Sequence, residues 1–490
     1  MMEEKYEIKP ARSVCLMPET EDSHPFCGIR HVNKPIDLAE YGYVEEEYLL
    51  YGDANLYSWP LGVRYAQKIM SECPYCTRIL VRKPKDAANF SGCAIVEIFN
   101  WARGYDRPIA AWGNCYEHIM ERGDAWIGVS SNSNVLNNLK KFDPVRYGDV
   151  GFVNPRPSET WYDIPQADAY HDFHTDASTE DGLVFDALSQ LAILLKEGNA
   201  RNPLYGSPAN LVLLTGAMPG TLSTYVSAVE PVSCAAGGKK LYDGFLIFMT
   251  GAPGNVNQLE DKLAPQDSRC KFSGDVPLIR LYTCGDMFGT GHHPDWAVLQ
   301  RHPDEDGPDS FFRSYELPGP NVFLRFVVGS EAKAEDLARM GIDNKRAGGR
   351  ASERDAALSK HNSWEFPTRY ILGALIERLK EWCGGKEPPA SRLLDVLGEY
   401  PDMRFAVDAY GNVTGGVRTP FLEVPIYQLR YEAYAEPLPK ELLQELYGDE
   451  KGYAKLFSES VNQCVSDGFL LADDAEKIKK EAENIDFDRL

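Results

Sequence analysis

The sequence predicts an α/β fold with a mostly parallel central sheet. Amphipathic helical patterns occur at residues 186–195 and 369–382. Strands that alternate with helical segments along a chain are typical of a parallel sheet covered by helices. Five short apolar runs have the length and composition of strands buried on both faces, and they lie at 93–99, 125–129, 210–215, 244–250 and 277–282.

The composition indicates a globular protein and argues against several classes of partner. Of the 490 residues, 43% are hydrophobic and 25% are charged, which excludes a disordered, collagen-like or coiled-coil chain. With 51 basic and 73 acidic residues the net charge is −22, and an acidic surface repels nucleic acids and anionic membranes. No apolar run reaches about 18 residues, and no signal-peptide pattern opens the chain. We therefore expect a cytoplasmic protein with a small-molecule substrate or ligand and an oligomeric state that the sequence leaves open.

One segment interrupts the alternation of strands and helices. Residues 132–181 are rich in Pro, Asp, Tyr and His, and they are too long for an ordinary loop. They predict either a surface loop or a lid and pocket wall over one end of the sheet. Residues 330–490 are predicted to be mostly helical and to pack on the core as a C-terminal elaboration. We expect one elaborated domain over residues 1–490.

The cysteines are consistent with a reducing compartment. Eleven cysteines are spread over the chain, an odd number that is unlike a disulfide-stapled secreted domain. The one tight pair is Cys73 and Cys76, which could form half of a zinc site or a redox pair. No second ligand pair stands at a suitable spacing, so two reduced, partly buried thiols are the favoured interpretation.

The most informative segment is NLVLLTGAMPGTLSTYVSAV, residues 210–229. A buried strand, a tight turn with Gly216 and Gly220, and a helical pattern follow one another, as in the G-x-S-x-G nucleophile elbow of α/β-hydrolases. The glycines are expected because a sharp strand-to-helix turn leaves little room for Cβ atoms. The central position of the motif, where the serine nucleophile stands, is Met218.

The chain resembles a large family of bacterial α/β-hydrolase domain proteins that are usually described as esterases. The resemblance implies an α/β-hydrolase fold: a mostly parallel central sheet flanked by helices, with a lid-like insertion and an elaborated helical C-terminal part. It extends over nearly the whole chain and is carried by the strings EEEYLLYGDANLYSW (45–59), VEIFNWARGYD (96–106), ERGDAWIGVSSNSNVLNNLKKFDPVRYG (121–148), EDGLVFDALSQLAILLK (180–196), YDGFL (242–246) and DAYGNVTGGVRTPFLEVP (408–425).

The resemblance also implies where the serine, acid and histidine of a hydrolase triad belong in this chain. The serine position falls on Met218. The acid segment corresponds to LYTCGD, in which Asp286 is the matching acid and Cys284 lies nearby. The histidine segment corresponds to YELPGPNV, in which Asn321 or Val322 takes the place of the histidine. A thioether has no proton to lose and an amide is not a base near neutral pH, so the triad is degenerate.

The oxyanion hole is expected to be incomplete as well. In this fold one donor is the backbone N–H of the residue after the nucleophile, and the other comes from the loop after an earlier strand. Pro219 follows Met218, and proline has no N–H. The other loop corresponds to residues 100–104, and we expect its Asn100 and Trp101 to line the pocket. Nucleophile, base and one oxyanion donor are thus all replaced.

Two histidine clusters are candidates for the chemistry that replaces the triad. His292 and His293 follow the acid strand on a glycine-rich loop, and either they act in catalysis or metal binding or they form a solvated pair. His171 and His174, in the predicted lid, share their segment with two aspartates, and the alternative is a polar loop. Because the spacing fixes no third ligand around His171 and His174, we predict no cofactor, and a metal held by a histidine cluster is the weaker alternative.

Cysteine and serine side chains supply the remaining candidates. Cys284 could be a thiolate nucleophile, but without an obvious base it is better interpreted as a small buried hydrophobe. Ser130 and Ser131 end the strand at 125–129 and could line the pocket as hydrogen-bond donors. Ser223 lies on the helix after the elbow and is expected to be structural.

These observations leave three hypotheses. The favoured one is an enzyme that acts on a small organic molecule in the inherited esterase pocket by a chemistry other than Ser-His-Asp ester hydrolysis, as a lyase, an isomerase or an atypical hydrolase. The second is a non-catalytic protein that binds a small molecule or a partner. The third is a carboxylic ester hydrolase with an unrecognised nucleophile.

Overall fold

The chain is represented by a computed structural model. By compactness it divides into two units. The first comprises residues within Met1–Pro277, Asp306–Phe311 and Phe326–Gly349, and the second residues within Leu278–Glu305, Phe312–Arg325 and Arg350–Leu490. The residues that the structure describes are 5–157, 177–217, 220–248, 253–260, 263, 267–272, 274–284, 301, 303–307, 310–318, 331–342, 368–398, 402–430 and 434–490.

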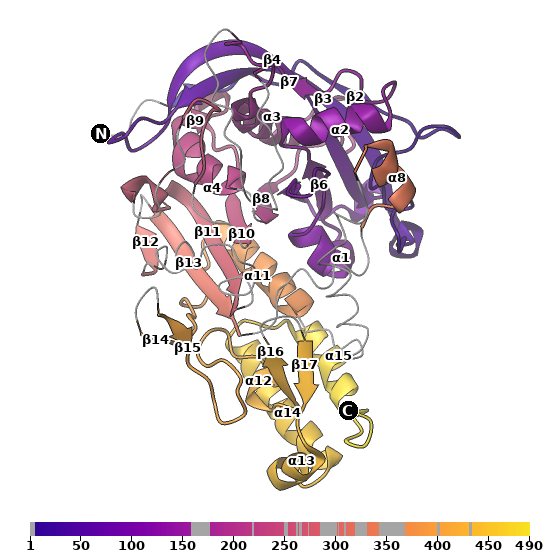
Figure 1. The fold of residues 1–490 in the computed structure, drawn as a ribbon, viewed down its shortest axis with the longest axis vertical. Helices are drawn as coiled ribbons and strands as arrows, with labels where there is room; N and C mark the ends of the chain where they lie inside the picture. Colours follow the sequence, from indigo (N-terminus) through magenta and orange to yellow (C-terminus); the bar gives the residue numbers. More distant parts are fainter. Residues whose placement is uncertain are drawn as a thin grey trace. The chain divides into compact units, whose positions relative to one another are not determined.

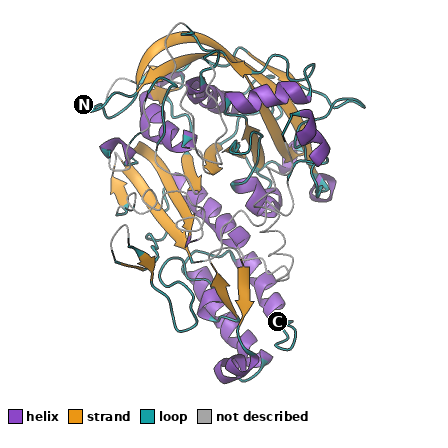
Figure 2. Ribbon diagram, in the orientation of Figure 1, coloured by secondary structure: helices purple, strands orange, loops and turns teal. Residues whose placement is uncertain are grey.

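A mixed sheet with a parallel centre forms the core of the first unit (Figure 1, Figure 2). Its strand order is β10-β8-β5-β6-β4-β3-β2, and β7 pairs with β4 outside this path. A separate parallel pair joins β1 (Tyr6–Glu7) to β9 (Ser233–Cys234). The strands of the sheet are β2 (Ser13–Leu16), β3 (Tyr43–Ser58), β4 (Gln67–Pro84), β5 (Cys93–Ile98), β6 (Ala125–Val129), β7 (Gly151–Phe152), β8 (Leu211–Ala217) and β10 (Gly244–Phe248).

The parallel centre consists of the strands that the apolar runs predicted. Strands β5, β6 and β10 are buried at every position, and β8 at every position but its first. The pairs β5–β6, β5–β8 and β8–β10 are all parallel. Strands buried on both faces read as continuous apolar runs, because neither face needs polar side chains. The strand predictions at 93–99, 125–129, 210–215 and 244–250 are confirmed within the described residues.

A long antiparallel hairpin extends the sheet on the other side of β6. Strands β3 and β4 pair from Tyr43 opposite Pro84 to Ser58 opposite Gln67, and their ribbons curve side by side in Figure 1. Strand β4 is antiparallel to β6, and β2 is antiparallel to β3. The apolar-run criterion did not identify this hairpin, because charged residues interrupt both of its strands.

Helices connect the strands of the first unit. Helix α2 follows β6, and its first N–H groups are capped by Asn132, whose side chain accepts hydrogen bonds from Asn134 N and Val135 N. Three residues separate helix α4 from the end of β8, and the helix continues as a π-helical turn, Tyr225–Val229. The helices are α1 (Ala111–Glu121), α2 (Ser133–Phe142), α3 (Val184–Lys196), α4 (Thr221–Thr224) and α8 (Ala334–Arg339).

The second unit carries most of two strands and a helical C-terminal region. Strand β11 (Gly274–Thr283) begins in the first unit and continues into the second, where it neighbours β13 (Ser310–Leu317). Strand β12 (Glu305–Gly307) has its first residue in the second unit and the other two in the first. The other elements of the second unit are α11 (Thr368–Cys383), β14 (Val396–Leu397), β15 (Arg404–Phe405), α12 (Pro420–Glu423), β16 (Tyr427–Arg430), β17 (Tyr434–Pro437), α13 (Lys440–Tyr447), α14 (Glu450–Ser466) and α15 (Ala472–Ala482).

Several predictions about organisation can be compared with these elements. The helices predicted at 186–195 and 369–382 correspond to α3 and α11, and the strand predicted at 277–282 lies within β11. The described part of 132–181 contains α2 and β7, and the rest of that segment, 158–176, lies outside the described residues. The single-domain and lid assignments stay predictions.

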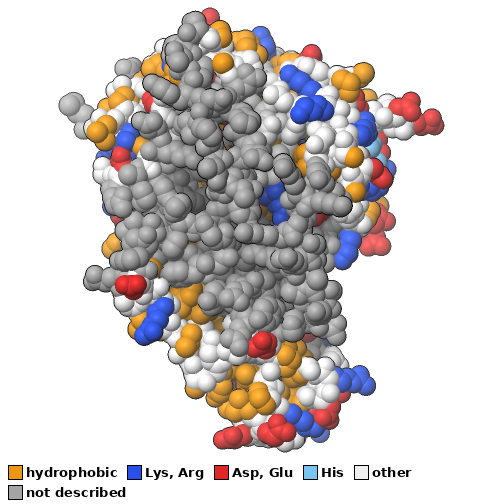
Figure 3. All heavy atoms as spheres, viewed as in Figure 1, with side chains coloured by type: hydrophobic (Ala, Val, Ile, Leu, Met, Phe, Trp, Pro, Cys, Tyr) orange, Lys and Arg blue, Asp and Glu red, His pale blue; other side chains and the backbone are white. Residues whose placement is uncertain are grey.

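Basic and acidic side chains of the described residues are both present on the face drawn in Figure 3. On the face drawn in Figure 3, the basic side chains of the described residues stand in small separate groups rather than in one continuous patch. Within the described part of the chain, no helix has both the length and the apolar character needed to cross a membrane.

Candidate functional site

The carboxyl ends of β5, β6 and β8 lie together at one edge of the sheet. Ile98 at the end of β5 is opposite Val129 of β6 on one side and Gly216 of β8 on the other. The chain leaves β5 for β6 on one side and later enters β8 on the opposite side, so its direction of progress along the sheet reverses at β5. In open α/β sheets, ligands bind outside the carboxyl ends of the strands at such a switch point.

The predicted elbow follows the end of β8. Strand β8 ends at Ala217 and helix α4 begins at Thr221, so three residues connect strand to helix. Met218 and Pro219 lie outside the described residues, and Gly220 is described. The strand, short connection and helix match the layout that the sequence predicted.

The steric reason expected for the two glycines is not supported. Gly220 has φ −59°, an ordinary helical value that any residue adopts. A Cβ added at Gly216 would lie 3.4 Å from Ile98 Cβ and 3.5 Å from Leu222 Cδ2, which is ordinary van der Waals contact. The expectation that these positions leave no room for a Cβ atom is therefore wrong at Gly216, and Gly220 needs no special backbone conformation.

Thr224 fixes the start of the helix after the elbow. Its backbone N–H and its Oγ1 hydroxyl both donate to the carbonyl of Gly220, each at 2.8 Å. The same Oγ1 accepts a hydrogen bond of 2.7 Å from the backbone N–H of Gly254, in the loop that follows β10. Ser223, the neighbouring residue, is fully buried, as expected for a structural serine.

Asn100 joins the loop after β5 to the end of β8. Its side-chain Nδ2 donates to the carbonyl of Ala217 at 3.2 Å, and its Oδ1 accepts from Ala102 N at 3.2 Å and from the guanidinium of Arg107. The backbones of Asn100 and Arg107 also pair in both directions. Asn100 is completely buried. This amide therefore holds the carbonyl immediately before Met218 in place, which the sequence prediction of a pocket residue did not anticipate.

The loop at 100–104 is closed by a tight turn. Gly104 N donates to the carbonyl of Trp101 at 2.8 Å, and Gly104 has φ 80°, a left-handed value that favours glycine. Arg103 forms an ion pair of 2.8 Å with Glu331, and both side chains are about one quarter exposed. Since Ala102 N and Gly104 N are engaged within the loop, these two N–H groups are not available to a ligand in this conformation.

Burial lowers the pKa of Arg107 but leaves its guanidinium charged at neutral pH. Burial, together with the nearby charge of Arg103, lowers the pKa of Arg107 to about 10. The guanidinium therefore remains charged at neutral pH, and its bond to Asn100 Oδ1 is charge-assisted.

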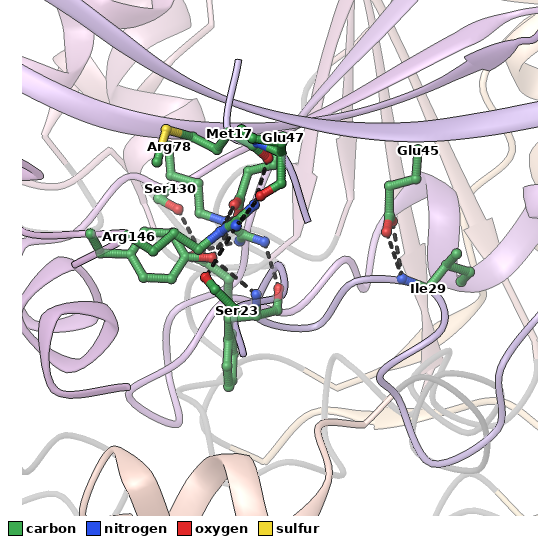
Figure 4. Close-up of polar contacts among 12 residues, drawn as sticks. Met17, Ser23, Ile29, Glu45, Glu47, Arg78, Ser130 and Arg146 are labelled. Atoms are coloured by element: carbon green, nitrogen blue, oxygen red, sulfur yellow. Dashed lines mark hydrogen bonds and ion pairs between the residues drawn. The ribbon is translucent and has the colours of Figure 1, made fainter. Parts of the chain in front are cut away.

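Ser130 belongs to a buried ionic network behind the same edge of the sheet (Figure 4). Its hydroxyl donates to Asp106, and Asp106 Oδ2 also accepts from Arg78 NH1 at 3.0 Å. Arg78 donates through Nε to Glu47, and Glu47 Oε2 accepts from Arg146 Nε at 2.5 Å. The four charged side chains are buried, and two acidic and two basic groups balance one another.

The network anchors the N-terminal segment to the sheet. Arg146 donates to the carbonyls of Met17 and Pro18 at 2.7 and 2.9 Å, and Arg78 donates to the carbonyl of Phe26 at 2.5 Å. A buried ion pair is costly to break on one side only, because the remaining charge stays buried without a partner. Ser130 is fully buried and engaged with Asp106, so in this conformation it is neither a pocket donor nor an exposed nucleophile.

The three cysteines singled out in the sequence are buried. Cys284 is buried in a cluster with Tyr282, Leu394 and Val413 in the second unit, which favours the apolar interpretation over the thiolate. Cys73 and Cys76 lie in β4, and burial raises the pKa of both thiols, that of Cys76 to about 12. Thiols of this kind are protonated at neutral pH and unreactive.

Most of the predicted catalytic residues lie outside the described residues. Among the residues that the structure does describe, no group of three or more His, Cys, Asp or Glu side chains is arranged to hold a metal ion. The convergence of the acid, the histidine loop and the histidine position on the elbow stays a prediction. The predicted site residues outside the described ranges are Met218, Pro219, Asp286, His292, His293, Asn321, His171 and His174.

Sequence reasoning missed two buried carboxylates of the first unit. Asp106 ends the string VEIFNWARGYD and holds Ser130, and Glu180 begins the string EDGLVFDALSQLAILLK. Burial is the main cause that raises the pKa of Glu180, to about 7. The position of both residues inside strings that resemble the family was the only sequence signal for them. A single acidic residue in a sequence does not indicate that its side chain is buried.

The parallel strands, the switch point at β5 and the strand-to-helix connection after β8 define an α/β-hydrolase fold. The chain belongs to the alpha/beta hydrolase domain family, whose model matches residues 9–480. This match confirms the resemblance and the fold class expected from the sequence. The degenerate triad stays a prediction.

The solved structures that this chain matches include several esterases and a hydrolase. The glucuronoyl esterase from Solibacter usitatus is 10% identical, with 62% of this chain and 85% of that chain covered and a TM-score of 0.25. The S-formylglutathione hydrolase from Agrobacterium tumefaciens is 8% identical, with 56% and 87% covered and a TM-score of 0.27. Esterase B from Lactobacillus rhamnosis is 9% identical, with 63% and 88% covered and a TM-score of 0.27. Among curated proteins, none matches this chain.

Proposed function

We propose that this protein acts on a small organic molecule at the carboxyl edge of β5, β6 and β8 by a route that forms no acyl-serine intermediate. The reaction classes that fit are those of a lyase, an isomerase or an atypical hydrolase. The ester-hydrolase pocket of the family is retained as a place to bind, and its nucleophilic chemistry is replaced.

The observation that carries this proposal is the residue between β8 and α4. The serine of a hydrolase elbow stands in this connection, and here the sequence has Met218 followed by Pro219. A thioether has no acidic proton, so Met218 cannot attack a substrate to form an acyl intermediate that water then cleaves. Pro219 has no backbone N–H, which is the oxyanion donor that normally follows the nucleophile. No single further substitution restores serine, histidine and oxyanion donor together.

The contacts around the connection support a retained site rather than a collapsed one. Asn100 holds the carbonyl of Ala217, and Thr224 holds the carbonyl of Gly220, so both ends of the connection are fixed by hydrogen bonds. A preorganised strand edge at a switch point is where α/β proteins bind small molecules.

The first test is labelling with a fluorophosphonate probe, which reacts with activated serines. We expect no labelling of the unmodified protein and only background labelling of Met218→Ser, because a serine without a histidine base is a weak nucleophile. A relative from the same family that carries the serine and the histidine is the positive control. Strong labelling of the unmodified protein would reveal a hidden nucleophile and overturn the proposal.

The second test locates and identifies the ligand. Native mass spectrometry of the protein purified from its own cells reports any retained small molecule, and hydrogen exchange with that compound added shows where it binds. We expect protection at residues 98–105 and 213–224, at the ends of β5 and β8. Protection confined to another part of the chain would contradict the proposed location.

A non-catalytic binding protein is the second candidate function. The joint replacement of nucleophile, histidine and oxyanion donor favours it, since a protein that only binds needs none of the three. Incubation of the identified compound with the protein separates the two. A changed compound with multiple turnovers supports the enzyme, and an unchanged compound that remains bound supports the binding protein.

A further inference from the structure

Arg107 is a buried cation at the candidate site. Its side chain is 5% exposed, and it forms no ion pair with a carboxylate among the described residues. In the same part of the chain its guanidinium makes one hydrogen bond, from NH2 to Asn100 Oδ1, and its Nε has no partner. A guanidinium carries five N–H donors, so most of those of Arg107 have no acceptor among the described residues.

Other buried arginines of the first unit are paired. Arg78, Arg82 and Arg146 are at most 4% exposed, and each forms an ion pair with a glutamate. This is the usual arrangement, because a charge taken out of water is costly unless an opposite charge or hydrogen bonds replace the solvent. Arg107 departs from it, and a bound anion would supply what the described chain does not.

The charges around Arg107 leave one positive charge in excess. Burial and the like charge of Arg103 lower the pKa of Arg107 to about 10, and the charge of Glu331 opposes this shift. Glu331 is itself paired with Arg103 at 2.8 Å. The ring of Tyr105 lies 5.9 Å from the guanidinium carbon, near the limit of a cation–π contact. Burial raises the pKa of Cys27, the remaining group that acts on Arg107, so its thiol is neutral. Two cations and one carboxylate give the cluster a net charge of +1.

The guanidinium lies close to the elbow connection. Arg107 ends the loop after β5, and its backbone pairs with that of Asn100 in both directions. The Asn100 side chain accepts from Arg107 and donates to the carbonyl of Ala217 at 3.2 Å. Ala217 directly precedes Met218. One amide side chain thus separates the guanidinium from the end of β8, which places the unpaired cation at the edge where we propose that the molecule binds.

We propose that Arg107 pairs with a carboxylate group of the molecule bound at this edge, so that the protein takes small organic carboxylates. The inference rests on the proposed function for the location of the molecule, and it adds the chemical class of that molecule. A planar guanidinium can donate two parallel hydrogen bonds to the two oxygens of a carboxylate, which makes arginine well suited to this group.

A charge count favours a carboxylate over a phosphate. A carboxylate carries one negative charge, which balances the excess of the cluster formed by Arg103, Arg107 and Glu331. A phosphate monoester carries about −1.5 to −2 at neutral pH, so part of its charge would stay unbalanced in a buried place. The net charge of −22 gives the whole chain no general attraction for anions. Recognition of an anion therefore depends on the local pairing with Arg107.

Isothermal titration calorimetry with matched probes tests the class of ligand. Acetate, butyrate and benzoate are compared at neutral pH with acetamide, butyramide and benzamide, which have similar shapes and no charge. We expect at least one carboxylate to bind about tenfold or more tightly than its amide, because charge-assisted hydrogen bonds are the stronger ones. Carboxylates that all bind no more tightly than their amides would overturn the proposal. Phenyl phosphate should bind more weakly than benzoate, and the reverse order would overturn the assignment to a carboxylate.

Arg107→Gln tests the residue. This variant should bind carboxylate and amide with affinities within about twofold of each other, because the charge that distinguishes them is gone. Arg30→Gln is the matched control, since it removes the same charge from a side chain that is 72% exposed. It should keep the preference for the carboxylate. A preference that survives in Arg107→Gln, or that is lost equally in Arg30→Gln, would contradict the role of Arg107.

Glu331→Gln keeps the test decisive if Arg107→Gln does not fold. The Glu331 side chain is about one quarter exposed, and its removal leaves both cations of the cluster without their carboxylate. The carboxylate probe should then bind about threefold more tightly and its amide as before, because less negative charge competes for Arg107. Unchanged or weaker binding of the carboxylate would overturn the proposal.

Two readouts separate this inference from the proposed function. Fluorophosphonate labelling reports on the nucleophile and does not involve Arg107. An unlabelled protein without an Arg107-dependent preference for carboxylates would overturn the present inference alone, and a strongly labelled protein with that preference would overturn the proposed function alone. Hydrogen exchange with the tightest carboxylate probe should show protection at residues 98–107. Protection confined to other parts of the chain would contradict the pairing with Arg107.

Discussion

Replacing Asn100 by alanine tests whether one amide organises the candidate site. Its side chain makes three hydrogen bonds, to the carbonyl of Ala217, from the N–H of Ala102 and from Arg107. Asn100→Ala removes all three hydrogen bonds and leaves their partner groups at a buried position without access to water. The loop after β5 and the end of β8 then lose the side-chain contact between them.

The expected cost follows from the groups left behind. The Ala217 carbonyl and the Ala102 N–H each lose a neutral hydrogen bond, at about 1 kcal/mol apiece. The Arg107 guanidinium keeps its charge while losing an oxygen partner, which adds about 1.5 to 3 kcal/mol. We expect Asn100→Ala to lower the free energy of unfolding of the first unit by about 3.5 to 5 kcal/mol.

Urea unfolding followed by circular dichroism measures this cost, and hydrogen exchange shows where it acts. Asn202→Ala is the matched control, since Asn202 is also buried and its side chain bonds to three carbonyls and one backbone N–H. Both variants should be destabilised, but only Asn100→Ala should speed exchange at 100–107 and 213–217. A cost below about 1 kcal/mol, or the same exchange pattern in both variants, would refute the assignment of Asn100 as the link between β5 and β8.

Three further predictions concern stability. Raising the pH from 6 to 8 should lower the free energy of unfolding by about 1.4 kcal/mol through Glu230 alone, because its pKa of about 7 in the fold exceeds the value of 4.5 in the unfolded chain. Urea unfolding of Glu230→Gln should therefore depend on pH less than that of the unmodified protein, by about 1.4 kcal/mol over the same range. Gly123→Ala should cost at least about 2 kcal/mol of stability, since Gly123 has φ 72° and its added Cβ would lie 2.4 Å from the carbonyl oxygen of Asn89. The control Gly62→Ala, at φ 81° with open space around it, should cost only about 1 kcal/mol. Equal costs for the two variants would contradict the clash at Gly123. Glu97→Ala should cost about 3 to 5 kcal/mol, because Glu97 accepts hydrogen bonds from two backbone N–H groups and one indole in the core, and a soluble variant of near-native stability would disprove this role.

The parallel centre of the sheet could be predicted because burial on both faces leaves a plain signal. Strands β5, β6, β8 and β10 contain almost no polar residues, so each appears as a continuous apolar run of strand length. The helices α3 and α11 were predicted for the related reason that their apolar residues repeat at helical spacing. In these strands and helices the apolar residues that the sequence pattern marks are the ones that the fold buries.

The β3–β4 hairpin could not be predicted in the same way, because its buried positions include charges. Glu47 in β3 and Arg78 in β4 are completely buried, and they neutralise each other together with Asp106 and Arg146. A single sequence assigns such residues to the surface, since charged side chains are rarely buried unless paired. The partners of Glu47 lie 31 and 99 residues away along the chain, and no local pattern reveals them.

The strand and the helix on either side of the connection could be predicted from the sequence, and their contacts could not. The bond from Asn100 to Ala217 spans 117 residues and depends on the pairing of β5 with β8. The raised pKa of Glu180 likewise depends on burial by segments that lie far apart in the sequence. Residue types and spacing predict that the nucleophile, the histidine and one oxyanion donor are replaced. Contacts between distant segments decide which side chains fix the ends of β8 and α4.

The contacts around the elbow explain how its nucleophile could be exchanged without loss of the fold. Gly216 and Gly220 were expected to mark a turn that only glycine tolerates, yet Gly216 has room for a Cβ atom and Gly220 has an ordinary helical φ. What fixes the ends of the connection is the Asn100 amide on the Ala217 carbonyl and the Thr224 hydroxyl on the Gly220 carbonyl. Both bonds come from side chains outside the G-x-S-x-G motif, so the scaffold and the nucleophile are supplied by different residues. A serine-to-methionine exchange at the centre of the motif therefore leaves both of these hydrogen bonds, and with them the ends of the connection, in place.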